Sequence, residues 1–136
     1  MDKISEHISY DEATKSPTAL RLKIINEPNE AQLASMKSVA NMCFEPLRKW
    51  YGKPIKINSF FRCAELNKAV GGAINSQHAK GEAIDISAGS KEENKKLYDY
   101  IKANLIFDQL INEYDYTWVH VSYKVGMNRN QTLSVV

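Results

Sequence analysis

The sequence predicts an α+β domain in which helices come first and an antiparallel sheet is built from the later strands. Two observations carry this prediction. Between Glu30 and Tyr51 the apolar residues recur at spacings of three and four, which is typical of one buried stripe on a long amphipathic helix. The second half of the chain instead holds short apolar runs with the composition of strands, separated by turn residues.

Size and composition limit the kinds of protein this chain can be. Its 136 residues are enough for one domain with a proper hydrophobic core. We divide this domain into an N-terminal segment (1–28), a central core region (29–124) and a tail (125–136). The net charge of +2 is too small to attract nucleic acid by its field alone. No stretch reaches the roughly 20 apolar residues of a membrane span. We expect a monomer whose two cysteines, Cys43 and Cys63, are free thiols.

The first residues, Met1 to His7, lack the apolar core of a signal peptide. The chain as given is therefore expected to stay in the cytosol where it is made, unless another agent exports it, cell lysis releases it, or it is part of a longer exported chain. His7 has nothing around it that indicates a site. We expect it to dock the N-terminal segment by hydrogen bonding.

The N-terminal segment is expected to hold one short helix. Ser9 and Glu12 resemble a capping box that opens a helical turn at 10–15, and Ser16-Pro17 should end it. Pro46 should kink or split the long helix, because proline lacks a backbone N–H. The later elements are expected in this order: a strand at 55–60, a short helix at 64–70, a loop at 73–80, a strand at 81–87, a helix at 91–103, two strands at 107–114 and 117–124, and an edge strand in the tail at 131–136.

An aspartate stands in the middle of the expected strand at 81–87. Asp85 is flanked by isoleucines, and burying a carboxylate is costly unless a partner satisfies it. His78 lies in the preceding loop and His120 in another strand-like run; two histidines and one carboxylate form a ligand set for catalytic zinc. The pattern therefore predicts a zinc site at these three residues. Taken singly, each residue also has a structural explanation: a surface histidine at 78, a salt bridge between Asp85 and Arg62, and a core histidine at 120.

A carboxylate beside the zinc would be useful as general base and acid, because zinc lowers the pKa of a bound water to about 7. If Asp115 and Tyr116 form a two-residue loop, Glu113 pairs with Trp118 and points to the same face as His120. A slip of one residue in this register would undo the arrangement. The hairpin therefore makes Glu113 the candidate base.

Several of these residues stand in one ordered pattern. Its positions are Arg62, then Ser76-x-His78-x-x-Gly81-x-Ala83-x-Asp85, then Trp118-x-His120. This pattern resembles the signature of the zinc D-Ala-D-Ala carboxypeptidase and L-alanyl-D-glutamate peptidase family, whose fold is shared with the hedgehog signalling domain. The resemblance covers about residues 30–124, and a small single-domain branch of the family is also similar over 54–62, 66–72 and 107–111.

The resemblance implies a hedgehog/DD-peptidase-like fold and a bound zinc ion (Zn2+). The implied ligands of this ion are His78, Asp85 and His120. Arg62 is implied to bind the substrate near the scissile carbonyl, where a fixed cation stabilises the developing oxyanion. Ser76 would line the pocket and hydrogen-bond the peptide, or else cap its own loop. Trp118 would wall the site, or else belong to the core.

One position departs from the family's pattern. Many members place the catalytic acid three residues before the last histidine, where this chain has Thr117. Threonine cannot act as a general base at neutral pH. Either Glu113 supplies the carboxylate from the neighbouring strand, or Asp115 supplies it from the turn, or the protein is a poor catalyst. The expected register of the hairpin, which places Glu113 on the face of His120, favours Glu113.

The combined expectation is a zinc peptidase that hydrolyses amide bonds in peptidoglycan stem peptides. It would be a carboxypeptidase, or an endopeptidase of the endolysin type, from a phage or a bacterium. Two other kinds of protein stay open. One is a non-catalytic module that keeps zinc while it binds the cell wall. The other is a metal-free structural domain, for instance of a phage particle, with an Arg62–Asp85 salt bridge in place of zinc.

Overall fold

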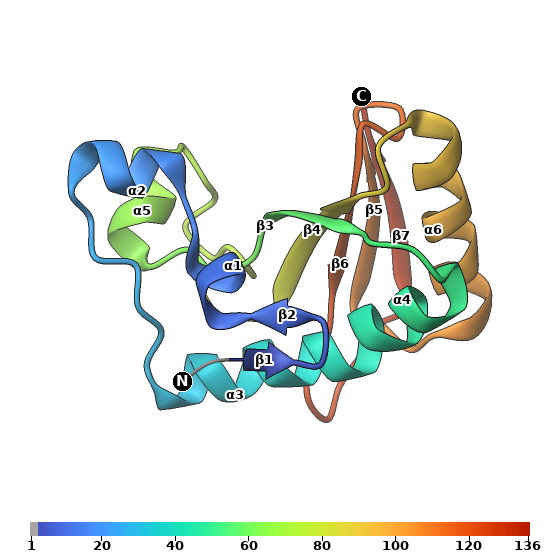
Figure 1. Cartoon of the computed structure of the whole chain (residues 1–136), viewed down its shortest axis with the longest axis horizontal. Coiled ribbons are helices and arrows are strands. Elements are labelled where there is room, and N and C mark those ends of the chain that lie inside the picture. Colours follow the sequence, from blue (N-terminus) through green and yellow to red (C-terminus); the bar gives the residue numbers. More distant parts are fainter. Residues whose placement is uncertain (1–2) are drawn as a thin grey trace.

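The computed structural model describes residues 3–136, and Figure 1 shows how its elements are arranged. The helices are α1 (Tyr10–Thr14), α2 (Pro17–Leu22), α3 (Glu30–Val39), α4 (Glu45–Tyr51), α5 (Ala64–Ala69) and α6 (Lys91–Asn104). The strands are β1 (Lys3–Ser5), β2 (Ile8–Ser9), β3 (Lys56–Ser59), β4 (Ala83–Ser87), β5 (Gln109–Glu113), β6 (Trp118–Ser122) and β7 (Gln131–Val135). This mixture of helices and sheet confirms the α+β class.

The main sheet has five strands in the order β3-β4-β6-β5-β7, and β1 pairs separately with β2. The pairs β3–β4, β4–β6 and β5–β6 are antiparallel. The tail adds an edge strand as expected, but β7 runs parallel to β5, so the expectation of a wholly antiparallel sheet was wrong at this edge. The connection 123–130 reverses the chain after β6 and carries it past β5, which gives β7 the direction of β5.

One face of the sheet is covered by helices and forms the core. Strand residues on this face are fully buried: Ile84, Ile86, Leu110, Val119 and Val121. They pack with residues of α3, α4 and α6; in Figure 1, α6 stands beside the sheet, and α3 and α4 run below it. Because side chains alternate along a strand, the residues between them point to the opposite face. Asp85 of β4, Glu113 of β5 and His120 of β6 lie on that opposite face.

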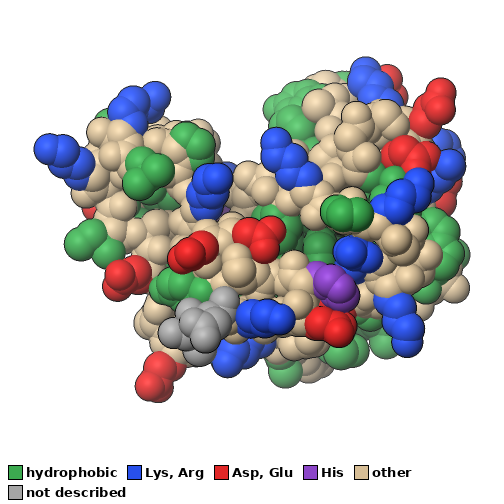
Figure 2. All heavy atoms as spheres, in the orientation of Figure 1, with side chains coloured by type: hydrophobic (Ala, Val, Ile, Leu, Met, Phe, Trp, Pro, Cys, Tyr) green, Lys and Arg blue, Asp and Glu red, His purple; other side chains and the backbone are tan. Residues whose placement is uncertain are grey.

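A second block of chain, containing α1, α2 and α5, lies on the other side of the sheet (Figure 1). Figure 2 shows a hollow in the molecular surface between this block and the larger part of the molecule, which contains the main sheet and α6. Asn26 ties the block together: Nδ2 donates to the carbonyls of Thr14 and Phe61, both at 2.9 Å, and Oδ1 accepts the N–H of Cys63 at 2.7 Å. These bonds fix the backbone on both sides of Arg62.

The start of the chain holds more structure than the sequence predicts. The capping box of α1 is confirmed, since the Glu12 N–H donates to Ser9 Oγ at 3.0 Å and the Ser9 N–H to Glu12 Oε1 at 3.1 Å. The β1–β2 hairpin and α2 were not expected. Ser16 and Pro17 end α1, but Ser16 Oγ also accepts the Ala19 N–H at 3.1 Å and Pro17 opens α2. Proline fits there because the first N–H of a helix has no partner anyway.

Pro46 splits the long helix, as expected. Between α3 and α4 lies one wider π-helical turn, Ala40–Phe44, in which the Glu45 N–H bonds the carbonyl of Ala40 five residues back. A proline ring clashes with the carbonyl four residues before it and has no N–H to offer that carbonyl. The π-helical turn accommodates this position while the apolar stripe continues into α4.

The two cysteines are free thiols, as expected, and burial raises the pKa of the Cys43 thiol to about 12. A thiol with so high a pKa stays protonated and behaves as a small apolar core residue. Within residues 3–136, no helix is long and apolar enough to cross a membrane.

His7 docks the N-terminal segment, and this expectation is confirmed. Its backbone N–H donates to Glu45 Oε2 at 2.9 Å, and its Nδ1 lies 2.6 Å from Glu45 Oε1. Ser5 Oγ donates to the same carboxylate at 2.5 Å. Burial raises the pKa of Glu45, but the hydrogen bonds from Ser5 and His7 lower it by more, so its pKa lies below the usual range. Glu45 therefore anchors the β1–β2 hairpin to the start of α4.

Replacing Glu45 with glutamine is expected to lower the free energy of unfolding by about 1–3 kcal/mol at neutral pH, because hydrogen bonds to a charged group are lost. Since folding lowers the pKa of Glu45, its contribution is present above the unfolded-state pKa of about 4.3 and is lost as the pH falls through the lower folded-state pKa. Urea unfolding of both proteins from about pH 7 to about pH 3 measures the difference. A difference that does not shrink toward acid pH contradicts this role; Glu27→Gln, at an exposed glutamate outside this group, is the control.

Candidate metal centre

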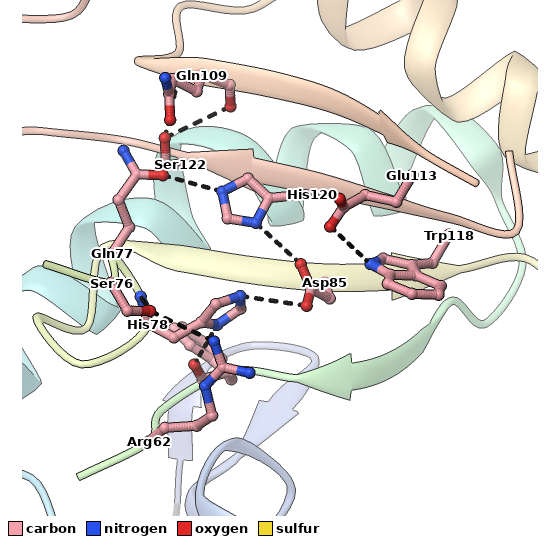
Figure 3. A network of polar contacts seen from close by, with 11 residues as sticks. Arg62, Ser76, Gln77, His78, Asp85, Gln109, Glu113, Trp118, His120 and Ser122 are labelled. Carbon is pink, nitrogen blue, oxygen red and sulfur yellow. Dashed lines mark hydrogen bonds and ion pairs between the residues drawn. The ribbon is translucent and has the colours of Figure 1, made fainter. Parts of the chain in front are cut away.

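The three predicted zinc ligands come from two paired strands and one loop. Asp85 on β4 lies directly opposite His120 on β6, so their side chains are neighbours on the open face of the sheet. His78 comes from the loop between α5 and β4, and Figure 3 shows it pointing toward Asp85. The structure therefore brings together residues that lie up to 42 positions apart in the sequence.

The loop that carries His78 is held against α3. Gly81 has a left-handed φ of +75°, and a Cβ atom there would lie 2.5 Å from the carbonyl oxygen of Gln32. Any other residue would be both strained and in collision at this position. Gln32 Nε2 also donates to the carbonyl of Ala79 at 3.2 Å. The close approach at Gly81 is therefore what lets α3 fix the position of His78.

The side chains of His78, Asp85 and His120 form one compact group, which we call the histidine–aspartate cluster. His78 Nε2 lies 3.2 Å from Asp85 Oδ2, and His120 Nδ1 lies 3.0 Å from Asp85 Oδ1 (Figure 3). One ligand atom from each residue lies within 4.8 Å of the others. The three residues are 4%, 8% and 7% exposed. The geometry thus offers three metal-binding atoms in one buried place.

The donor chemistry of the cluster fits a metal ion. His78 Nδ1 lies 2.8 Å from the carbonyl oxygen of Phe60, which can only accept, so this nitrogen carries a proton. When it is neutral, a ring held in this way presents the lone pair of Nε2 to the carboxylate of Asp85. A lone pair and a carboxylate repel each other unless a proton or a cation lies between them. Zinc binds imidazole nitrogen and carboxylate oxygen alike, so the cluster suits it.

Asp85 is ionised in this environment. Burial alone would raise its pKa, but the hydrogen bonds with His120 and His78 outweigh burial and hold the pKa well below the usual range. Within residues 3–136 the basic side chains that contact the Asp85 carboxylate are these two histidines, and no salt bridge joins it to Arg62. The structural explanation that paired Asp85 with Arg62 is therefore wrong, and the carboxylate is available as a ligand.

Arg62 and Ser76 lie beside the cluster. The Arg62 N–H donates to the carbonyl of His78 at 3.3 Å, and Arg62 Nη2 donates to Ser76 Oγ at 3.3 Å. Ser76 Oγ also accepts the His78 N–H at 3.2 Å, so it caps its own loop, one of the two roles expected for it. Arg62 Nε is buried without a partner among the described residues. Burial lowers the pKa of Arg62, and the charge of Asp85 opposes this shift.

The predicted register of the β5–β6 hairpin is confirmed. Glu113 lies opposite Trp118, and Ile111 lies opposite His120. Glu113 Oε2 accepts the Trp118 Nε1–H at 3.2 Å, and Figure 3 shows both side chains on the same side of the sheet as the cluster. Trp118 is half-buried and lies outside the main apolar core. The Glu113 carboxylate therefore lies on the face predicted from the sequence.

The loop of this hairpin differs from the expected two-residue turn. The strands end at Glu113 and Trp118, and residues 114–116 all adopt left-handed φ angles of 50°, 55° and 61°. The side chain of Asn112 stabilises this unusual turn by accepting the Tyr116 N–H at 2.6 Å. A four-residue loop closed in this way keeps the strand pairing that a two-residue loop would give.

Asp115, the other carboxylate considered for the role of base, and Thr117 are both engaged elsewhere. Asp115 is exposed, and its Oδ2 lies 3.5 Å from Lys91 Nζ at the start of α6. Thr117 donates its hydroxyl to a carbonyl of the hairpin loop at 2.6 Å. Neither contact places these side chains in the histidine–aspartate cluster.

Two polar residues beside the cluster received no role from the sequence. Gln77 Oε1 lies 2.9 Å from His120 Nε2, and Gln77 Nε2 donates to Asp108 Oδ2 at 3.0 Å. Gln77 directly precedes a predicted ligand, and Asp108 lies in the stretch 107–111 that resembles the peptidase family. These positions were therefore visible, but a contact between residues 31 apart cannot be inferred from spacing alone.

Comparison with known proteins agrees with this geometry. The model of the Peptidase M15 family matches residues 6–122. A stretch of 39 residues is 51% identical to the zinc D-Ala-D-Ala carboxypeptidase of Streptomyces albus G, covering 29% of this chain and 15% of that protein. The chain thus spans a small part of that relative's length. Because the family match covers most of the sequence, this chain belongs to the Peptidase M15 family.

Proposed function

We propose that this protein is a zinc-dependent peptidase that hydrolyses amide bonds in peptidoglycan stem peptides, as a carboxypeptidase or as an endopeptidase. The observation that carries the proposal is the buried histidine–aspartate cluster, whose three ligand atoms face one another in a member of the Peptidase M15 family. The zinc D-Ala-D-Ala carboxypeptidase of Streptomyces albus G supports both the metal and the substrate class. We further propose a monomeric single domain, residues 1–136, with the hedgehog/DD-peptidase fold.

In this proposal His78 Nε2, a carboxylate oxygen of Asp85 and His120 Nδ1 hold the zinc ion. Zinc bound there supplies a Lewis acid and lowers the pKa of water, so that a nucleophile is available at neutral pH. The ionised state of Asp85 and the proton of His78 on Nδ1 support these ligand atoms. The backbone carbonyl of Phe60 accepts the Nδ1–H of His78 and so orients the ring, as a hydrogen-bond acceptor usually does for a metal-binding histidine.

The remaining residues act on the substrate. Glu113 takes a proton from the attacking water and passes it to the leaving amine, a task that its place on the open face supports. Trp118 orients the Glu113 carboxylate through its indole N–H and forms a wall of the site. Arg62, steadied by Ser76, stabilises the oxyanion that develops on the scissile carbonyl. Ser76 lines the pocket next to the guanidinium.

A second function is favoured by one observation. Thr117 occupies the position where many relatives of this kind carry their catalytic acid, and its hydroxyl is bound within the hairpin loop. A protein that kept zinc but lost catalysis would bind peptidoglycan without cutting it. The two functions differ in one measurable product, because hydrolysis releases new amino groups and binding does not.

Digestion of purified peptidoglycan, followed by mass spectrometry of the muropeptides, tests the proposed function. The zinc-loaded protein is expected to release shortened stem peptides, a chelator is expected to abolish this release, and added zinc is expected to restore it. Intact muropeptides together with sedimentation of the protein on cell walls would support the binding module instead. The mass lost from each muropeptide also identifies the bond that is cut.

A further inference from the structure

We propose that Gln77 and Asp108 are positioning residues that hold the His120 ring in the form that presents Nδ1 to the metal. This inference rests on the proposed zinc site and deepens it. The support is a directed chain of hydrogen bonds that begins at Arg129, on the surface, and ends at the histidine–aspartate cluster. Each group in this chain of hydrogen bonds determines whether the next group must donate or accept.

The first acceptor in this chain of hydrogen bonds, Asp108, is fixed in place. Asp108 is 2% exposed, and its Oδ1 accepts the N–H and the Nε–H of Arg129 at 3.1 Å and 2.9 Å. Its Oδ2 accepts Arg129 Nη2–H at 2.7 Å. The backbone of Asp108 is also held, since its N–H donates to the carbonyl of Ser122 at 2.8 Å. An ionised carboxylate can only accept hydrogen bonds, so any group that meets Asp108 must donate.

Gln77 meets that requirement with its amide nitrogen. Gln77 Nε2 lies 3.0 Å from Asp108 Oδ2, and this contact decides which way the amide group points. Gln77 Oε1 is then turned toward His120, 2.9 Å from Nε2 (Figure 3). If the amide were reversed, its oxygen would face the carboxylate of Asp108 and lose a hydrogen bond. Asp108 thus determines the orientation of Gln77.

The oriented amide in turn determines the state of His120. An amide oxygen only accepts, so His120 Nε2 must carry the proton that it donates to Gln77. The other ring nitrogen, Nδ1, is then free to offer its lone pair, and it lies 3.0 Å from Asp85 Oδ1 in the cluster. His78 is arranged with the opposite nitrogen inward, because a backbone carbonyl holds its Nδ1. The two histidines are therefore fixed by different outer partners.

A purely structural role for Gln77, which would only tie its loop to β5, predicts different behaviour. In that case the loss of the side-chain bonds would lower stability but would leave the zinc affinity of the folded protein unchanged. The decisive readouts are therefore zinc affinity and the protonation of His120 Nε2, both measured on folded, metal-loaded protein.

The test is Gln77→Met, which keeps the length of the side chain and removes both hydrogen bonds. Competition with a chromophoric chelator is expected to show zinc binding weakened by about 10- to 100-fold, the usual effect of losing an outer partner of a ligand. In NMR spectra of the zinc-loaded protein, the ring N–H signal of His120 Nε2 is expected to be present in the parent protein and lost to exchange in the variant. Gln109→Met is the matched control, since Gln109 Nε2 donates to the side chain of Gln131 and not to the cluster, and both readouts should stay at parent values.

Exchanging the hydrogen-bond donor and acceptor between positions 77 and 108 provides a second, independent test. Gln77→Glu alone places two carboxylates face to face at about the 3.0 Å contact seen between Gln77 and Asp108, and zinc binding should weaken. Adding Asp108→Asn exchanges donor and acceptor between the two positions, so that residue 77 still accepts from His120. The double variant is expected to regain the zinc affinity of the parent. Recovery by this exchange is not expected of residues that only tie the loop to β5.

The outcomes separate this inference from the proposed function. Zinc affinity within about twofold of the parent in Gln77→Met, with the Nε2 proton still observed, would overturn the positioning role while leaving the zinc peptidase intact. A parent protein that binds no zinc overturns both proposals together. Weakened zinc binding in Gln77→Met with recovery in the double variant supports the positioning role, whether or not the protein cuts peptidoglycan.

Discussion

His120→Ala is expected to abolish stoichiometric zinc binding and peptidase activity together. His120 lies directly opposite Asp85 on the paired strand, and its Nδ1 is one of three ligand atoms in the buried cluster. Without it, two ligands remain, which is fewer than the three protein ligands usual at catalytic zinc sites. Metal analysis of the purified variant, together with the muropeptide assay, measures both losses in one preparation.

The matched control for this variant is His7→Ala. His7 is a histidine as well, but it lies at the surface and bonds Glu45 rather than the cluster. It is expected to keep one zinc ion per chain and full activity, with some loss of stability. Zinc retained at full occupancy in His120→Ala would falsify the ligand assignment.

Glu113→Gln is expected to leave zinc bound while lowering turnover by about 10²- to 10⁴-fold, the usual contribution of a general acid–base. Glutamine keeps the shape of the side chain and can still accept from Trp118 Nε1, but it cannot take a proton from water. The fall should appear in kcat, because the interaction that is lost belongs to the transition state. Steady-state kinetics on a purified muropeptide, with zinc analysis of the same sample, gives both quantities.

Asp115→Asn is the control for the choice of base. Asp115 is exposed and lies near Lys91, so its replacement is expected to leave turnover unchanged. If Glu113→Gln hydrolyses peptide normally while Asp115→Asn does not, the base is Asp115 in the hairpin loop and not Glu113. If both variants are inactive on a protein that still binds zinc, the loop itself must contribute to positioning Glu113.

The parts of the site that could be predicted from sequence are those that follow from strand alternation and hairpin pairing. Alternation along a strand places Asp85 and the apolar Ile84 on opposite faces, and antiparallel pairing places Glu113 on the face of His120. The register was right although the loop was wrong, because the buried face of β5 and β6 fixes the pairing more strongly than the turn does. Three consecutive left-handed residues at 114–116 have no simple sequence signal, since none of them is glycine.

The parts that could not be predicted depend on contacts between distant segments. Gln77 and Asp108 act through each other, and nothing in either local sequence shows that they meet. The parallel pairing of β7 likewise depends on where the connection 123–130 carries the chain. The helix α2 is a different case. Ser16-Pro17 can begin a helix as well as end one, whereas the sequence prediction used it only as the end of α1.

The histidine–aspartate cluster is expected to hold the zinc ion. Anomalous diffraction from crystals of the zinc-loaded protein, recorded on both sides of the zinc absorption edge, locates the ion. We expect one peak, lying between His78 Nε2, His120 Nδ1 and the Asp85 carboxylate. Within residues 3–136 the other group of potential ligands is Glu6, His7 and Glu45 at the surface. A peak at that surface group alone, or no peak at the buried cluster, would contradict the account.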